Sequence, residues 1–212
     1  MALKLPRGLY ALIDDGVRPE VPVPTKARWA LEGGAAVLQL RLEQTLDRAA
    51  LAWVREVVAL AGAVPVIVND RVDLCLAGQA AGVHLGDDDL PVEVARRLLG
   101  PDALIGVTTR GRADLERARA QGADHVGLGP IFATSTKQVS APSLGIERFA
   151  ALVKASPLPV VGIAGITLDT IGAVASAGAR CAAVAGDLLR ADDVVARARA
   201  LAAAFDDGAG SG

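Results

Sequence analysis

Residues 46–70, LDRAALAWVREVVALAGAVPVIVND, combine an Ala- and Leu-rich helical stretch, a stop at Gly62 and a short apolar run from Val64 to Asn69. The same order recurs along the chain: ADLERARAQGAD leads into HVGLGP, IERFAALVKASP into LPVVGIAGI, and LDTIGAVASAGAR into CAAVAGD. A Gly suits the left-handed position that ends a helix, and an apolar run without alternation suits a strand buried on both faces. Strands of that kind belong to parallel sheets, so the pattern predicts alternating helices and parallel strands.

Eight such apolar runs are spread over the chain, with helix-patterned segments between and after them. They are Leu9–Ile13, Ala36–Arg41, Val64–Asn69, Gly82–Leu85, Leu104–Thr108, His125–Leu128, Pro159–Ile163 and Cys181–Ala185. Eight strand-helix units predict an α/β protein with a single-domain (β/α)₈ TIM barrel, which we expect over residues 1–206 with a flexible tail at 207–212. The alternative is an open doubly wound sheet, which usually carries GxGxxG after its first strand, whereas LYALIDDGVRP has two aspartates there.

Composition and charge exclude several classes of function. Of the 212 residues 52% are apolar and 22% charged, and 22 Lys and Arg against 24 Asp and Glu leave a formal charge of −2. A nucleic-acid or acidic-membrane binder would carry a basic excess, so we expect neither partner. Cys75 and Cys181 sit in apolar runs, which predicts buried thiols in a reducing cytoplasm. No stretch has the uninterrupted apolar core of a signal peptide or the roughly 18 apolar residues of a membrane span, so neither export nor anchoring is expected.

Polar residues cluster where the predicted strands end, which is the active-site face of such a barrel. They include Asp14, Asp15, Gln39, Arg41, Asn69, Asp70, His84, Asp87, Asp88, Asp89, Thr108, Thr109, Arg110 and the GPIFATSTKQ loop. Converging carboxylates can hold Mg²⁺, which often bridges protein and phosphate. Arg41 and Lys137 would neutralise a diphosphate, and the Gly-rich turns after the last two strands offer N–H groups to a second phosphate. The alternative for a single residue such as Asp70 is that it only caps the next helix.

Several of these stretches resemble one known family over essentially the whole chain. They are LYALIDD, VLQLR, VPVIVNDRVDLCLAGQAAGVHLGDDDLP, GADHVGLGPIFATSTK and PLPVVGIAGIT. The chain resembles the thiamine phosphate synthases, transferases of thiamine biosynthesis that join a hydroxymethylpyrimidine diphosphate to a thiazole phosphate on a (β/α)₈ barrel. The resemblance implies small-molecule substrates and release of pyrophosphate, and it leaves homo-oligomerisation open.

The resemblance also implies roles for individual residues. Asp70 and Asp89 fall where the family binds Mg²⁺, and Arg41, Lys137 and Thr108 where it acts on the leaving diphosphate. The positions implied for substrate binding are Gln39, Arg41, Asn69, His84, Thr108 and Lys137 for the pyrimidine diphosphate, and Thr134, Thr136, Gly165 and Gly186 with Asp187 for the thiazole phosphate. The implied chemistry is departure of pyrophosphate to leave a stabilised pyrimidine cation, which the thiazole nitrogen captures.

Some positions depart from the family pattern. Glu43 stands where a Lys is usual, Arg110 where a His is usual, and Asp187 adds a negative charge near the expected thiazole phosphate; Asp87 and Gln138 are further departures. We expect Arg110 to offset Glu43 or to contact the diphosphate itself, the alternative being that both point to solvent. The departures keep two other functions open: a thiazole tautomerase-like enzyme acting on thiazole phosphate alone, and a non-catalytic regulatory protein that binds phosphate ligands.

Overall fold

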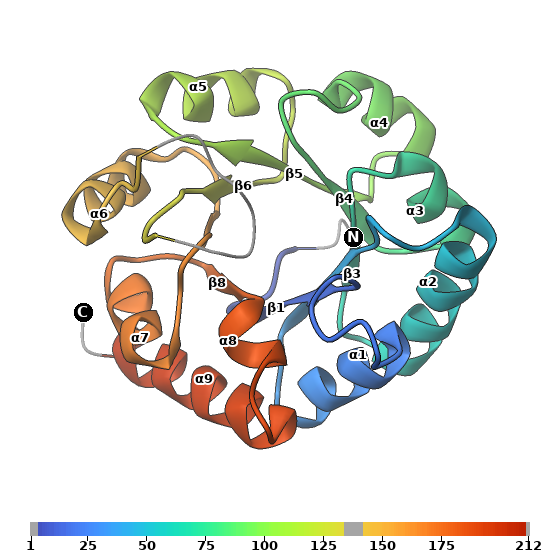
Figure 1. Ribbon diagram of the computed structural model, residues 1–212. Coiled ribbons are helices and arrows are strands. Elements are labelled where there is room, and N and C mark those ends of the chain that lie inside the picture. Colours follow the sequence, from blue (N-terminus) through green and yellow to red (C-terminus); the bar gives the residue numbers. More distant parts are fainter. Residues whose placement is uncertain (1–3, 134–141, 211–212) are drawn as a thin grey trace.

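The computed structural model describes residues 4–133 and 142–210, and these form a closed barrel of eight parallel strands in the order β1 to β8 (Figure 1). The strands are β1 Gly8–Asp14, β2 Val37–Arg41, β3 Val66–Asn69, β4 Gly82–Leu85, β5 Leu104–Thr109, β6 His125–Leu128, β7 Val160–Gly162 and β8 Cys181–Val184. All eight predicted strands are therefore present, and the predicted (β/α)₈ barrel is confirmed. The ring closes where β1 pairs with β8, with Gly8 opposite Cys181 and Ala11 opposite Val184.

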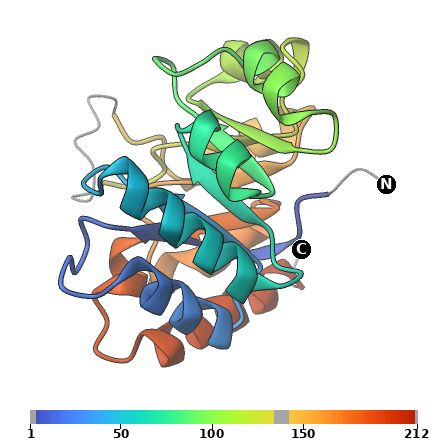
Figure 2. The ribbon, with the colours of Figure 1, turned by 90° about the vertical axis from the view of Figure 1, so that its right-hand side faces the viewer.

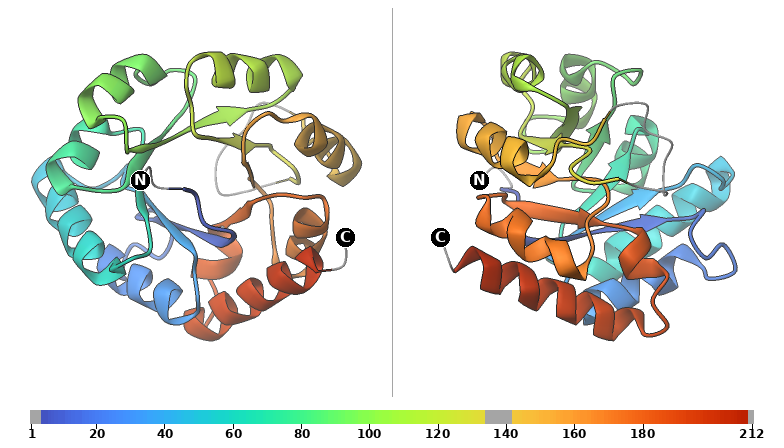
Figure 3. Two further views of the ribbon diagram at one scale, coloured as in Figure 1. Left: turned by 180° about the vertical axis from the view of Figure 1, so that it is seen from behind. Right: turned by 60° about the vertical axis from the view of Figure 1, so that its left-hand side comes forward.

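Helices surround the barrel and connect its strands, as the views from both ends show (Figures 1 and 3). They are α1 Val23–Glu32, α2 Asp47–Ala61, α3 Val72–Gly78, α4 Val92–Leu99, α5 Arg112–Ala120, α6 Ile146–Ala155, α7 Leu168–Ser176, the short α8 Gly186–Leu189 and α9 Val194–Ala209. The predicted Gly stops are confirmed after α2 and α7, because Gly62 and Gly178 have φ values of 57° and 90°.

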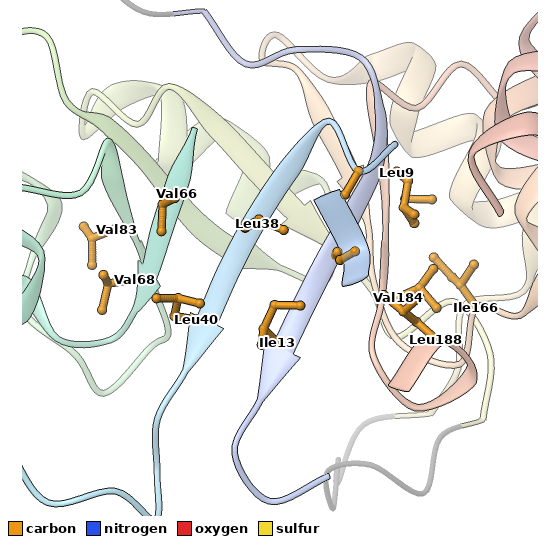
Figure 4. Close-up of a cluster of buried hydrophobic side chains, with 14 of the residues drawn as sticks. Leu9, Ile13, Leu38, Leu40, Val66, Val68, Val83, Ile166, Val184 and Leu188 are labelled. Carbon is orange, nitrogen blue, oxygen red and sulfur yellow. The ribbon is translucent and has the colours of Figure 1, made fainter. Parts of the chain in front are cut away.

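Two apolar cores hold the barrel together. Strand residues that point outward, including Leu9, Leu38 and Val68, pack against the helices in the larger core (Figure 4). The smaller core fills the barrel interior with Leu5, Tyr10, Val37, Ile67, Leu104, Val161, Cys181 and Ala183. Because each strand is buried on both faces, its sequence shows a continuous apolar run rather than alternation.

The structure corrects the predicted boundaries near the C-terminus. Helix α9 continues to Ala209, so residues 207–209, expected to belong to a flexible tail, are helical. Gly208 lies against Gly172 of α7, where an added Cβ would meet the Gly172 carbonyl oxygen at 2.3 Å, and its own carbonyl accepts a 2.8 Å bond from Ser176 Oγ. The small residues that suggested a tail therefore allow two helices to approach closely.

The start of β1 and the end of α9 lie on the same side of the barrel (Figures 2 and 3). Cys75 and Cys181 are buried free thiols, as predicted, and burial raises the pKa of each to about 12. No helix in the described part of the chain has both the length and the apolar character needed to cross a membrane.

Candidate active site

A pocket of about 1110 Å³ opens at the carboxyl ends of the strands. Its wall contains most of the described residues that the sequence singles out: Gln39, Arg41, Asn69, Asp70, His84, Asp87, Asp88, Asp89, Thr108, Arg110, Gly165, Gly186 and Asp187. These residues come from six of the eight strands or from the loops that follow them. The closed barrel thus brings together side chains that are far apart in the sequence.

Arg41 ends β2 opposite Asp14 of β1, and the two side chains form an ion pair. Arg41 Nη1 lies 3.1 Å from Asp14 Oδ2, and both side chains are about nine-tenths buried. Arg41 Nε also donates to Glu43 Oε1 at 2.8 Å, and the Glu43 side chain is half exposed. The charge of Arg41 is therefore shared by two carboxylates, of which Glu43 is free to turn toward solvent.

Gln39 lies deeper in the barrel beside Tyr10. Its Nε2 donates to the Tyr10 hydroxyl at 2.9 Å, and both residues are buried. Burial raises the pKa of Tyr10 far above its ordinary value, so the phenol stays protonated. The bond fixes the orientation of the Gln39 amide at the pocket floor.

Asp70 directly follows β3 and has a left-handed backbone with φ of 62°. Its N–H donates to the His84 carbonyl oxygen at 2.8 Å, which ties the end of β3 to β4. Helix α3 begins after Arg71, which occupies the N-cap position, so Asp70 is not the N-cap residue of this helix. A non-glycine residue in this region costs about 1–2 kcal/mol, although Asp and Asn tolerate it better than most. Strain of this kind tends to persist where a side chain must be presented to a site.

His84 faces the pocket from β4, and its space comes from glycines on neighbouring strands. A Cβ at Gly106 would lie 2.8 Å from His84 Nδ1, and one at Gly127 would lie 2.9 Å from His84 Cε1. His84 Nε2 lies 3.0 Å from Thr108 Oγ1, within hydrogen-bond distance. Two residues predicted to bind the same substrate therefore hold each other in place.

His125, at the start of β6, is fully buried below this layer. A Cβ at Gly106 would meet its Nε2 at 2.2 Å, and its ring centroid lies 6.1 Å from that of His84. Neither ring nitrogen has a hydrogen-bond partner among the described residues. Desolvation, assisted by His84, lowers the pKa of His125 to about 3, so the ring is neutral.

The loop after β4 carries Asp89, whose Oδ2 accepts a bond from the Gly86 N–H at 2.6 Å. In the same loop, Asp87 forms an ion pair with Arg110 from the loop after β5. The expected pairing of Arg110 with Glu43 is therefore wrong: Asp87 lies within its reach, and Glu43 pairs with Arg41. Two departures from the family pattern do neutralise each other's charge, and these are Asp87 and Arg110.

The turns after β7 and β8 form the other side of the pocket. Gly165 has φ of 70°, and a Cβ there would lie 2.5 Å from the Ala133 carbonyl oxygen, so the turn requires glycine. Asp187 Oδ2 accepts a bond from the Leu168 N–H at 3.2 Å and lies 3.3 Å from Arg197 Nη1. The carboxylate of Asp187 is thus neutralised by an arginine and a helix N-terminus.

The loop after β6 is the remaining part of the predicted site. Thr134, Thr136, Lys137 and Gln138 lie outside the described residues. Their predicted roles stay predictions. Gly129, Pro130 and Ala133, which precede this segment, line the pocket.

The possible ligands for a metal are few. No group of three or more His, Cys, Asp or Glu side chains suited to a metal ion occurs within residues 4–133 and 142–210. Asp70 and Asp89 both line the pocket, however, and Mg²⁺ is commonly held by one or two carboxylates together with substrate phosphates and water. Two hard oxygen ligands therefore fit this metal when a diphosphate supplies further oxygens.

A family model described as thiamine monophosphate synthase matches residues 9–188, which span the barrel from β1 to α8. The chain belongs to the thiamine monophosphate synthase family. The thiamine-phosphate synthase of Myxococcus xanthus is 55% identical over 207 residues, which cover 96% of this chain and 94% of that protein. The thiamine-phosphate synthase of Anaeromyxobacter dehalogenans is 49% identical over 202 residues, covering 95% and 89%.

Solved structures agree with this membership of the thiamine monophosphate synthase family. Thiamine phosphate pyrophosphorylase from Pyrococcus furiosus matches with a TM-score of 0.87 at 30% identity, covering 95% of this chain and 96% of that one. A 3-hexulose-6-phosphate synthase matches with a TM-score of 0.69 at 21% identity, which shows the barrel fold alone. The predictions of the family and of a transferase of the thiamine phosphate synthase type are confirmed.

The pocket-wall residues that the sequence-based predictions miss include Tyr10, Arg190 and Arg197. Tyr10 had a usable signal, because Tyr10 and Leu12 alternate within LYALIDD and therefore point to the same face of the strand. Arg197 had no such signal, because it lies in an Arg- and Ala-rich helical stretch and nothing in the sequence distinguishes it from the other arginines there.

Proposed function

We propose that this chain joins a hydroxymethylpyrimidine diphosphate to a thiazole phosphate and releases pyrophosphate, with Mg²⁺ as its metal. One observation carries the proposal: a single pocket at the strand ends has Asp70, Asp89 and Arg41 in its wall. Carboxylates for a divalent cation beside a guanidinium suit a diphosphate better than an uncharged ligand. The relatives named thiamine-phosphate synthase support the same activity.

The reaction needs charge stabilisation and orientation more than proton transfer. The bond between the pyrimidinylmethyl carbon and the diphosphate oxygen breaks, and its electron pair leaves with pyrophosphate. The lone pair of the thiazole nitrogen then forms the new C–N bond, and the ring becomes a thiazolium cation. Arg41 would bind the departing anion, and ordered neighbours such as His84 and Gln39 would orient the pyrimidine.

Asp70 and Asp89 would hold the metal from the ends of β3 and β4. Bound Mg²⁺ would neutralise negative charge on the leaving diphosphate. The left-handed backbone of Asp70 and the bond from Gly86 N–H to Asp89 Oδ2 set the positions of the two carboxylates. Lys137 and Thr108 belong to the same proposal as further groups acting on the diphosphate.

The test is to incubate the purified protein with both substrates and Mg²⁺ and to follow thiamine phosphate by chromatography and pyrophosphate by an enzyme-coupled assay. Equal amounts of both products, dependent on each substrate and abolished by EDTA, are expected. Isomerisation of thiazole phosphate alone would indicate a tautomerase-like enzyme. Ligand-dependent thermal stabilisation without any product would indicate a non-catalytic binding protein. Either result would overturn the proposal.

A cytoplasmic location for this activity is part of the proposal. It is supported by the two buried free thiols, which are typical of proteins from reducing compartments.

A further inference from the structure

Two arginines lie in the pocket wall on the side formed by β7 and β8. Arg190 directly follows α8, and Arg197 lies in the first turn of α9, which begins at Val194. Figure 1 shows α8 inside the ring of the other helices, next to β8 and β1. The polypeptide after β8 therefore turns inward and brings these cations to the pocket.

Both guanidinium groups have N–H donors without a hydrogen-bond partner among residues 4–133 and 142–210. Arg197 contacts Asp187 through Nη1 alone, at 3.3 and 3.5 Å from the two carboxylate oxygens. Arg71, by contrast, holds Asp73 with Nε and Nη2 at 2.8 and 2.6 Å. The Arg190 N–H donates to the Gly186 carbonyl oxygen at 3.1 Å, but its guanidinium has no hydrogen bond or ion pair with any residue in the described ranges. Since a guanidinium carries five N–H donors, the pair can accept an anion without breaking other bonds.

The charge balance at this side of the pocket favours an anion. Arg190 and Arg197 contribute two positive charges and Asp187 one negative charge. The Asp187 carboxylate is also bonded to the Leu168 N–H at 3.2 Å, which holds it toward α7. A local excess of one positive charge remains, in a chain whose net charge is −2. Oxygens of a phosphate suit the planar donor fork of arginine.

This cationic side is separate from the proposed metal site. The strands follow one another around the ring in the order β1 to β8, so β7 and β8 lie across the barrel from β3 and β4, which lead to Asp70 and Asp89. The pocket thus has two regions that can bind anions. The carboxylates of one region require a bound metal to attract an anion, whereas the arginines of the other bind an anion directly.

We propose that Arg197 and Arg190 bind the phosphate group of the second substrate, thiazole phosphate, and make the enzyme select the phosphorylated thiazole over its alcohol. The inference rests on the proposed function, because it assigns a substrate group to this side of the same pocket. It adds two side chains to those that the family resemblance implies for this phosphate, namely Thr134, Thr136 and Asp187 with the glycine turns at Gly165 and Gly186.

The test compares Arg197→Ala and Arg190→Ala with Arg199→Ala. Arg199 lies on the same helix as Arg197, but it is exposed and does not line the pocket. The two pocket variants should raise KM for thiazole phosphate about 10- to 100-fold, the range expected for loss of a charged hydrogen bond, while KM for the pyrimidine diphosphate stays within about twofold. Arg199→Ala should match the wild type in both constants.

Calorimetric binding of thiazole phosphate and of the thiazole alcohol separates this inference from the proposed function. The wild type should prefer the phosphate, and the two pocket variants should lose most of that preference even if no turnover occurs. An unchanged preference, or an equal rise of KM for both substrates, would overturn the inference. Wild-type turnover combined with unaffected variants would overturn the inference and leave the proposed function standing.

Discussion

Replacement of the buried His125 by Leu should make the stability of the protein less sensitive to acid. The His125 pKa is about 3 in the folded protein and 6.5 in an unfolded chain. Between these two pH values the unfolded state binds a proton at His125 and the folded state does not. The wild type should therefore lose stability as pH falls from about 6.5 toward 3. With about 1.4 kcal/mol per pKa unit, the loss relative to pH 8 is about 1.4 kcal/mol at pH 5.5 and about 2.7 kcal/mol at pH 4.5.

Urea unfolding of the wild type and His125→Leu at pH 8, 5.5 and 4.5 measures this difference. All carboxylates and His84 are common to both proteins, so subtracting the variant's pH dependence leaves the contribution of His125. At pH 8 the variant should lose at most about 1 kcal/mol of unfolding free energy relative to the wild type. The loss is small because the substitution removes two buried nitrogens that have no partners among the described residues. Identical pH dependence in the two proteins would refute the reasoning.

Three further predictions concern the pocket. Asp70→Asn and Asp89→Asn should each raise the Mg²⁺ concentration needed for half-maximal activity while keeping the fold, since Asn also tolerates the φ of 62° at position 70; an unchanged Mg²⁺ titration would remove that residue from the metal site. Lys137→Ala should lower kcat about a hundredfold with an unchanged Tm, and parallel loss of Tm and kcat would instead indicate a structural lysine. The half-exposed Asp87–Arg110 pair should show a coupling energy below about 1 kcal/mol in a double-mutant cycle of unfolding free energies, and a clearly larger coupling would contradict its description as a surface ion pair.

The periodicity of the sequence was enough to predict the strand order and most of the strand positions. β4 and β6 begin and end where the apolar runs do, whereas β7 is shorter than its run at both ends. Pro159 has no N–H to donate to the ladder, and Ala164, just past the run, turns away with φ of 69°. Such ends depend on local backbone geometry, which hydrophobicity does not encode.

Side-chain partners were harder to predict than positions. Arg110 pairs with Asp87 and not with Glu43, and this choice depends on how the loops after β4 and β5 pack. Arg197 reaches the pocket from a helix that sequence periodicity describes only as a covering helix. The location of strand-end residues in the site is predictable because the barrel fold brings all strand ends to one face. Which helix residues reach the site can be found only from the three-dimensional structure.

Pairing of β1 with β8 also constrains how the protein is made. The edge of β1 that faces β8 has no partner until Cys181–Val184 have left the ribosome, when nearly all of the chain is already synthesised. An apolar strand with unpaired N–H and C=O groups is a template for intermolecular association during that interval. Nascent chains halted before Cys181 should therefore bind chaperones or aggregate. Emergence of β8 from the ribosome should end the exposure of the β1 edge.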